Sequence, residues 1–370
     1  MKKLGFGLLR LPKLAGSSHI DLEASIPMID LAISHGVTYF DTAYTYNEGT
    51  NEFIFRDAIA KRYSRDAYTI TDKMPMMNIE REEQLEPILQ EQLVKCGVDF
   101  FDYYWLHAIG GPNYERAVKS RAFEHLVTIK KRGIAKHIGM SYHGTPELLD
   151  KVLSEHPEIE FVQIQLNYLD WLDKTVQSKA CHDVCVKHNK PIIVMEPVKG
   201  GTLATVPPEV EAKMRAMDPN MSPASWAIRF AASQEGVMTV LSGMTTLAQV
   251  EDNLSFMDEF VPLTEEEQAT LLECAEIIRG IVAVPCTGCR YCVDDCPMNI
   301  CIPDYFSVYN TIKRFEGMYR ADVVNYYNNL KFAHGKPTDC IRCGMCESRC
   351  PQGLPIRDYL EEAGAFLERA

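Results

Sequence analysis

The sequence predicts an α/β protein in which a barrel of eight parallel strands and eight helices precedes a small, mostly helical domain. Over residues 1 to about 260, short apolar runs alternate with amphipathic helical patterns. After about residue 263 this alternation stops and cysteine becomes frequent. The chain has 370 residues, which is more than one ordinary domain needs. We therefore expect one domain over residues 1–262 and a second over residues 263–370.

Eight apolar runs are the predicted strands, at residues 4–8, 37–40, 67–70, 101–106, 137–140, 161–165, 191–195 and 237–241. Helical patterns lie between them, at residues 22–35, 50–62, 81–96, 114–132, 145–155, 172–189, 223–234 and 246–258. Thr145-Pro146 and Ser222-Pro223 are typical helix starts, and Cys96-Gly97 is a typical helix end. Eight strand–helix pairs of this length predict a closed (β/α)8 barrel. A doubly wound open sheet is the alternative, because eight short strands can also lie flat.

Composition narrows the classes of function. Hydrophobic residues make up 46% of the chain and charged residues 24%, which is ordinary for a globular protein. The formal net charge is −13, so we expect no nucleic-acid partner, since such partners need a basic surface. No apolar run approaches the length of a membrane span, and the first residues lack the apolar stretch of a signal peptide. With 13 cysteines, this pattern leads us to expect metal ligation in a reducing, cytoplasmic compartment and no membrane partner.

Two identical cysteine runs dominate the second domain. Both follow the spacing C-x2-C-x2-C-x3-C-P, and they comprise Cys286, Cys289, Cys292 and Cys296, then Cys340, Cys343, Cys346 and Cys350. This spacing is typical of proteins with two [4Fe–4S] clusters, in which the fourth cysteine of each run binds the other cluster. We therefore expect one cluster on Cys286, Cys289, Cys292 and Cys350, and another on Cys340, Cys343, Cys346 and Cys296. Zinc is the alternative metal, but a tetrahedral zinc site gives no reason for the third cysteine of each run.

The remainder of the second domain has a helical pattern. Residues 263–279 open with acidic residues that suit a helix start. Apolar residues at Ile302, Phe306, Tyr309, Ile312 and Phe315 lie on one helical face, and residues 321–332 also have a helical pattern. The domain is thus more similar to the α-helical ferredoxins than to compact bacterial ferredoxins.

Three consecutive predicted strands end in ionisable residues. Asp41 ends the second strand, Lys73 follows the third, and His107 ends the fourth. Tyr46 lies in the loop just after Asp41. Active sites of such barrels lie where strands end, so we expect these side chains on one rim. The lysine is expected to lower the pKa of Tyr46, which makes the tyrosine a proton donor, while His107 hydrogen-bonds a substrate oxygen.

These residues and their neighbours resemble the aldo-keto reductase superfamily over about residues 1–260. The segments that resemble it are Gly36–Ala43 with Tyr46, then Lys73, then Asp102–His107. The resemblance implies hydride transfer between a nicotinamide and an aldehyde or ketone. It implies Tyr46 as the acid, Asp41 and Lys73 as residues that tune it, and His107 as the residue that orients the carbonyl group. A plain buried ion pair between Asp41 and Lys73 is the structural alternative.

The same resemblance implies residues that bind the cofactor. Ser141 and Gln163 correspond to contacts with the nicotinamide amide, and Gly200 and Gly201 could approach a pyrophosphate closely. Glu196 follows Met195, which stands where the family has an aromatic ring. Ser242, Gly243 and Asn253 are the remaining expected cofactor contacts. The basic residues that select the 2′-phosphate of NADP are absent at Gly243, Met244 and Gln249, so NAD and NADP both remain open.

These departures resemble the subgroup of aldo-keto reductases that has a C-terminal ferredoxin-type domain with two [4Fe–4S] clusters. We expect an oxidoreductase that acts on a small-molecule carbonyl or alcohol and relays electrons through the clusters. The alternative is an electron-transfer or redox-sensing subunit whose barrel is a docking scaffold for a redox protein partner. A flavin would couple two-electron and one-electron chemistry, and the sequence does not exclude one.

Overall fold

The structure is a computed structural model that describes residues 2–17, 19–173, 176–281, 283–314, 327–328 and 330–368. The chain divides into two compact units, and each is described by itself. The first comprises residues 1–172, 177–197 and 224–264, and the second comprises residues 173–176, 198–223 and 265–370. Phe315 and residues 321–326 of the predicted later helix lie outside the described residues.

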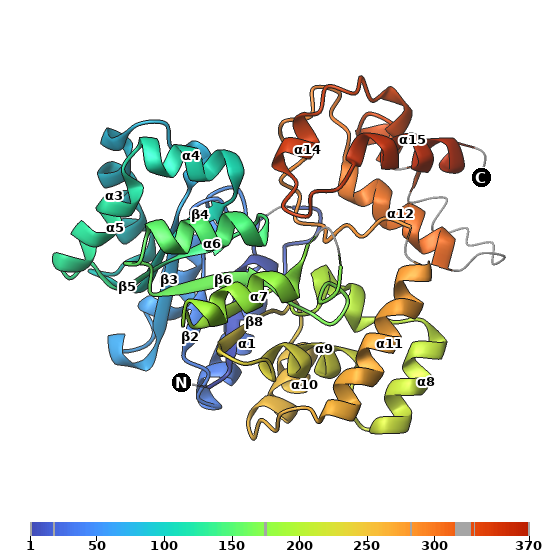
Figure 1. Cartoon of the computed structure of the whole chain (residues 1–370), viewed down its shortest axis with the longest axis horizontal. Coiled ribbons are helices and arrows are strands. Elements are labelled where there is room, and N and C mark those ends of the chain that lie inside the picture. The colour runs from blue at the N-terminus through green and yellow to red at the C-terminus, as the bar shows by residue number, and fades with distance from the viewer. Residues whose placement is uncertain are drawn as a thin grey trace. The chain divides into compact units, whose positions relative to one another are not determined.

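The first unit is a closed barrel of eight parallel strands in sequence order (Figure 1). The strands are β1 Leu4–Gly7, β2 Tyr39–Asp41, β3 Thr69–Met74, β4 Phe101–Ile109, β5 Ala135–Tyr142, β6 Phe161–Gln165, β7 Ile192–Met195 and β8 Val237–Gly243. β1 pairs with both β2 and β8, which closes the sheet. The barrel prediction is confirmed, and the alternative of an open sheet is wrong.

Helices surround this barrel. They are α1 Leu22–Ser34, α2 Asn51–Phe55, α3 Leu85–Cys96, α4 Gly111–Lys119, α5 Ala122–Lys131, α6 Pro146–Glu155, α7 Ser178–Lys187, α9 Pro223–Ala232 and α10 Leu247–Met257. Thr145 caps α6 as predicted, because its side chain accepts a hydrogen bond from the amide of Leu148. The single helix predicted over residues 114–132 is wrong: the chain breaks at Arg121, whose φ is +58°. Both halves keep their apolar faces inward, so the hydrophobic pattern alone did not reveal the break.

Large side chains fill the interior of the barrel. Tyr39, Trp105, Phe161, Ile193 and Leu241 form a buried cluster there. The Tyr39 hydroxyl and the Thr71 hydroxyl lie 2.5 Å apart across the β2–β3 pair. This packed layer closes the barrel below the ends of the strands, so the barrel is a solid core and not a pore.

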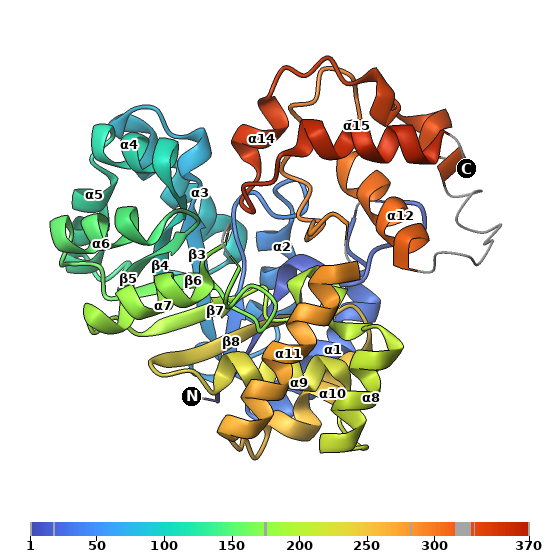
Figure 2. The ribbon, with the colours of Figure 1, turned by 45° about the vertical axis from the view of Figure 1, so that its right-hand side comes forward.

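The second unit contains the helices α8 Pro208–Met217, α11 Glu265–Ile281, α12 Ile302–Arg314, α14 Met345–Arg349 and α15 Ile356–Leu367. Figures 1 and 2 both show α8 beside α11. The Lys213 ammonium on α8 lies 3.0 Å from the Glu273 carboxylate on α11. The sequence analysis missed α8, although Pro207-Pro208 is a typical helix start. The predicted helices at residues 263–279 and after residue 301 are confirmed by α11 and α12.

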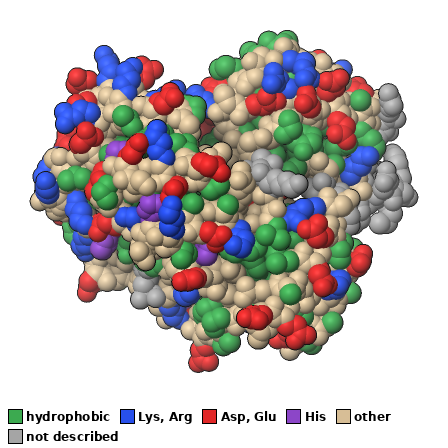
Figure 3. All heavy atoms as spheres, viewed as in Figure 1, with side chains coloured by type: hydrophobic (Ala, Val, Ile, Leu, Met, Phe, Trp, Pro, Cys, Tyr) green, Lys and Arg blue, Asp and Glu red, His purple; other side chains and the backbone are tan. Residues whose placement is uncertain are grey.

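The face drawn in Figure 3 has basic and acidic side chains side by side, without a large area of one sign. Many exposed charges in the described part of the chain form ion pairs, such as Arg132 with Glu86 and Lys187 with Asp150. None of the described helices is both long enough and apolar enough to span a bilayer.

Candidate active site and cysteine cavities

Strand alternation directs the predicted residues to one place. Side chains two residues apart on a strand point to the same face. Tyr39 and Trp105 belong to the barrel interior, so Asp41 and His107, two residues later, also point inward. Lys73 is opposite Trp105 in the β3–β4 register, and its ammonium lies 5.3 Å from the centre of the Trp105 ring. The three residues therefore converge above the aromatic layer.

Lys73 is the centre of this group. Its ammonium donates hydrogen bonds to Asp41 Oδ1 at 2.7 Å and to the carbonyl oxygen of Thr42 at 2.7 Å. It also lies 3.3 Å from the Tyr46 hydroxyl. Tyr46 is held by the turn after β2, where its amide donates to the Ala43 carbonyl at 3.1 Å. Burial raises the pKa of Asp41 and lowers the pKa of Lys73, while the ion pair opposes both shifts.

His107 faces Tyr46 from β4. The two ring centres are 5.9 Å apart and the rings are nearly perpendicular at 78°. Burial, helped by the charge of Lys73, keeps the pKa of His107 well below its usual value, so the imidazole is neutral at pH 7. Among the described residues, His107 Nδ1 and Asp41 Oδ2 are buried without a hydrogen-bond partner. Buried polar atoms without partners are costly, so both atoms are available to hydrogen-bond a polar ligand or a water molecule.

The prediction that the lysine lowers the pKa of Tyr46 is wrong for the structure without ligands. Burial raises the pKa of Tyr46 well above its usual value, and the charges of Asp41, Glu196 and Asp72 add to this. The sequence analysis considered only the nearby ammonium, whereas burial and three carboxylates have the larger effect. Tyr46 is thus firmly protonated, which is the state that a proton donor needs.

Two of the expected nicotinamide contacts lie side by side. Ser141 on β5 is opposite Gln163 on β6, and both are buried. The Ser141 hydroxyl accepts a hydrogen bond from the amide of Ala108 at 2.7 Å. Ala108 directly follows His107, so this bond ties Ser141, an expected cofactor contact, to the residue expected to orient the substrate.

Glu196 lies at the rim of the barrel after β7. Its carboxylate lies 3.3 Å from the guanidinium of Arg10, and its backbone carbonyl accepts a bond from Asn167 at 2.9 Å. Its charge helps to raise the pKa of Tyr46, so the carboxylate acts on the same group of residues. The sequence analysis did not identify Arg10 or Asn167, because their partner lies more than 25 residues away in the chain.

The expected contacts at β8 interact mainly with the protein itself. The Asn253 amide donates to the Ser242 hydroxyl at 2.7 Å. A side chain at Gly243 would meet Arg10, 3.1 Å from its nearest carbons. Gly200 and Gly201 have φ values of +63° and +98°, which favour glycine. A side chain on Gly200 would lie 2.1 Å from the Thr287 carbonyl oxygen, so its close approach is to the protein's own backbone.

A second polar group lies on the outer side of β3, and the sequence analysis missed it. Asp72 points away from Lys73 and lies with Glu52 and Cys96, their polar atoms within 4.8 Å of one another. Burial raises the pKa of both carboxyl groups, and the charge of Asp72 raises the pKa of Glu52 further, so Glu52 is the one of the two that keeps a proton. The Asp72 carboxylate accepts the backbone amide of Lys73 at 2.8 Å and supports the strand behind the ion pair. Glu52, Asp72 and Cys96 belong to α2, β3 and α3, so no motif within one segment of the sequence indicates this contact.

The cysteines of the second unit meet in two sets of four. Cys286, Cys289, Cys292 and Cys350 line one cavity, with Phe306, Leu354 and Ile356 among its other residues. Cys296, Cys340, Cys343 and Cys346 line another, with Ile300 and Leu360. Each set contains three cysteines of one run and the last cysteine of the other, which is the expected crossing. Backbone amides donate to sulfur, as from Gly288 to Cys286 at 3.4 Å and from Arg342 to Cys340 at 3.4 Å. Four thiols in a largely apolar cavity fit an iron–sulfur cluster.

The fold and these sites define an oxidoreductase built from a barrel and an iron–sulfur domain. The aldo/keto reductase family model matches residues 3–276, and the model of a 4Fe-4S dicluster domain matches residues 285–354. The chain belongs to the aldo/keto reductase family.

Individual relatives are distant. A probable aldo-keto reductase of Glycine max is 28% identical over 173 residues, which are 45% of this chain and about half of that relative, 48%. A methylglyoxal reductase of Yersinia pestis is 26% identical over 261 residues, which are 69% of this chain and 87% of that relative. The structure of an aldo-keto reductase from Klebsiella pneumoniae in complex with NADPH has a TM-score of 0.58 and 18% identity, and the match covers 73% of this chain and 89% of that one.

Proposed function

We propose that this protein interconverts a carbonyl and an alcohol in the barrel pocket, with Tyr46 as the general acid. The observation that supports this most directly is the position of the Lys73 ammonium, 2.7 Å from Asp41 and 3.3 Å from the Tyr46 hydroxyl. When bound, a nicotinamide supplies the hydride, and Ser141 and Gln163 are the residues that would hold its amide group. The Klebsiella pneumoniae relative binds NADPH, which supports a nicotinamide as the cofactor of this chain.

Each residue of the pocket has a distinct task in this proposal. The Tyr46 hydroxyl gives its proton to the substrate oxygen, and the Lys73 ammonium stabilises the phenolate that remains. Asp41 keeps Lys73 charged against the effect of burial. His107, neutral at pH 7, hydrogen-bonds the substrate oxygen through a ring nitrogen and fixes its position.

We also propose that the two cysteine sets hold [4Fe–4S] clusters, which supply one-electron chemistry when bound. Cys286, Cys289, Cys292 and Cys350 hold one, and Cys296, Cys340, Cys343 and Cys346 hold the other. A small redox protein is the expected partner. In support, Cys343 is exposed, and its neighbours Ile341 and Met345 are 60% and 48% exposed. The same exposure favours the second candidate function, an electron carrier whose barrel is only a scaffold.

Two variants separate these functions. Tyr46→Phe should lower carbonyl turnover by about 10²- to 10⁴-fold while both clusters remain, because it removes the acid. Tyr44→Phe is the matched control, since that hydroxyl lies 3.2 Å from the exposed Glu91 and not in the pocket. Cys289→Ala should abolish exchange with a low-potential electron donor and leave the barrel folded. Normal turnover in Tyr46→Phe together with a dead Cys289→Ala would favour the scaffold. Full carbonyl turnover of Cys289→Ala with a nicotinamide would disprove that the clusters exchange electrons with the reaction in the barrel.

Binding measurements can show which cofactor connects the two-electron reaction in the barrel with the one-electron chemistry of the clusters. Anaerobic titrations of the cluster-loaded protein with NADH, NADPH and FMN show which of them the pocket accepts. Binding of a nicotinamide alone supports the proposal as stated, whereas tight binding of FMN adds a flavin to it.

A further inference from the structure

Lys199 is a buried lysine beside the first cysteine cavity. It follows β7 by four residues, belongs to the second unit, and is 2% exposed. Its ammonium lies 3.5 Å from the side-chain oxygen of Gln352. Gln352 comes two residues after Cys350 and lines the cavity formed by that cysteine's set. Because the ammonium is buried, little solvent screens its charge from the neighbouring cavity.

The backbone around Lys199 is held against both cysteine runs. Lys199, Gly200 and Gly201 have φ values of +46°, +63° and +98°, so three successive residues are left-handed. For lysine this conformation is strained, and it persists only where the surroundings determine it. Gly200 lies against the carbonyl of Thr287, which directly follows Cys286. The segment is thus fixed between Thr287 of the first run and Gln352 of the second, both of which line the same cavity.

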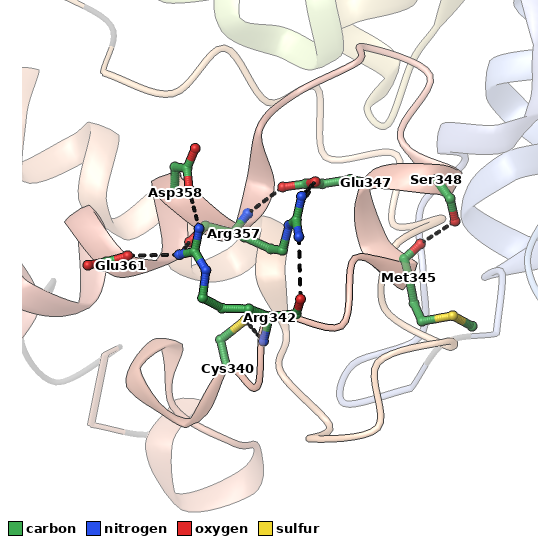
Figure 4. A network of polar contacts seen from close by, with 8 residues as sticks. All are labelled: Cys340, Arg342, Met345, Glu347, Ser348, Arg357, Asp358 and Glu361. Atoms are coloured by element: carbon green, nitrogen blue, oxygen red, sulfur yellow. Dashed lines mark hydrogen bonds and ion pairs between the residues drawn. The ribbon is translucent and has the colours of Figure 1, made fainter.

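The other cavity has a different electrostatic setting. Arg357 lines it, but its guanidinium forms an ion pair with Glu347 at 2.7 Å and is 38% exposed (Figure 4). Arg342, beside Cys340, is 48% exposed and forms ion pairs with Asp358 and Glu361 (Figure 4). Solvent therefore screens the positive charges at this cavity more than it screens the buried ammonium of Lys199.

We propose that Lys199 raises the reduction potential of the cluster held by Cys286, Cys289, Cys292 and Cys350 relative to that of the other cluster. This inference rests on the proposed function, in which both cavities hold [4Fe–4S] clusters. One-electron reduction, by a low-potential one-electron donor, adds one negative charge to a cluster. A buried ammonium nearby stabilises that charge more strongly than an exposed one, since little solvent screens it. Net charge around a cluster is among the factors that set its potential. In this proposal Lys199 acts on the cluster only through its charge and binds no iron.

The test is an anaerobic redox titration with dithionite, followed by EPR. Lys199→Met and Lys199→Gln remove the charge, and Lys199→Arg retains it. Lys213→Met is the matched control, because Lys213 is a lysine of the same unit that pairs with exposed Glu273. Cys343→Ser, which removes a ligand of the second set only, assigns the two signals. The uncharged variants should lower the ratio of reduced to oxidised cluster about tenfold at a fixed solution potential, a shift of about 59 mV. The second cluster, Lys199→Arg and Lys213→Met should be unchanged.

Several outcomes would overturn the inference. Unchanged potentials in both uncharged variants would do so, and so would equal shifts of both clusters. If Lys199→Met does not assemble, Lys199→Gln decides, since it keeps a polar group toward Gln352 without the charge. If the first cluster is lost in Lys199→Met and Lys199→Gln but kept in Lys199→Arg, the charge of Lys199 is needed for cluster assembly, and the proposed role in setting the potential is overturned. Iron and sulfide analysis of the wild-type protein comes first: a chain without the first cluster refutes the proposed function and this inference together, whereas a loaded chain with unshifted potentials refutes the inference alone.

Discussion

Lys73 and Asp41 form an ion pair inside the barrel, with Nζ and Oδ1 2.7 Å apart and side chains 0% and 4% exposed. The strands that hold them are neighbours, and alternation turns both side chains inward. The pair is therefore a feature of the barrel core as well as of the candidate active site, and it has consequences for stability that can be measured separately from activity.

Lys73→Met should destabilise the barrel by about 3–5 kcal/mol, because it leaves the buried Asp41 carboxylate without its partner. All three tryptophans, Trp105, Trp171 and Trp226, lie in the first unit, so tryptophan fluorescence during urea unfolding reports on the barrel. Combining Lys73→Met with Asp41→Asn should recover much of the loss. Lys130→Met, which breaks a partly exposed pair with Glu160, should have a much smaller effect. Equal losses of unfolding free energy in Lys73→Met and Lys130→Met would contradict this account.

Acid should destabilise the barrel partly through His107. The pKa of His107 is lowered in the folded state, so its contribution to stability is complete above the unfolded value of about 6.5 and is lost as the pH falls below it. The free energy of unfolding should fall by up to about 1.4 kcal/mol per pH unit for this one proton. Unfolding of the wild type and of His107→Gln between pH 8 and pH 5 measures the difference. His137→Gln, at a half-exposed histidine, is the control. An identical acid dependence in His107→Gln and the wild type would show that burial of His107 does not matter.

Any nicotinamide should bind with little preference for NADP over NAD. Met244 is buried, and Gln249 caps its own helix by accepting the amides of Thr245 and Thr246. A charge-assisted contact to a phosphate contributes about 1.5–3 kcal/mol, and two such contacts are replaced here by neutral residues. The dissociation constants of NADH and NADPH, measured by titration, should therefore lie within about tenfold of each other. Strong NADPH selectivity that disappears in Arg10→Met would mean that Arg10, which lies against Gly243, supplies the phosphate contact.

The crossed arrangement of cysteines predicts which cluster each variant damages. Anaerobically purified protein should contain about eight iron and eight sulfide per chain. Cys296→Ala should damage the cluster of the second run, since Cys296 lines the cavity of Cys340, Cys343 and Cys346. Cys350→Ala, the matched variant, should damage the other cluster. EPR of the two variants identifies the missing signal. About four irons in the wild type, zinc in place of iron, or loss of the neighbouring cluster in Cys296→Ala would each contradict the assignment.

Much of the fold could be predicted because its signals are local and repetitive. The period of the apolar residues distinguished strands from helices, and strand ends marked Asp41, Lys73 and His107 as residues of one rim. The errors arose where a local pattern had two outcomes. The long helical pattern over residues 114–132 suited one helix or two, and Arg121 carries no mark of a left-handed residue. The sequence analysis missed α8 because this short, polar segment between β7 and β8 suited a loop as well as a helix.

By itself, the sequence determined the class of protein, because spacing along the chain encodes it. Three features can be read directly from positions along the chain: the paired cysteine runs, the alternation of strands and helices, and the order of Asp41, Tyr46, Lys73 and His107. Tertiary structure alone decided the quantities that depend on burial and on distant partners. It raised the pKa of Tyr46, where a lone ammonium predicted the opposite, and it joined Glu52 to Asp72 behind the ion pair. It also brought Lys199 to Gln352, 153 positions later in the chain. Electrostatic effects depend on distance and solvent exposure in space, and neither can be read from the order of residues.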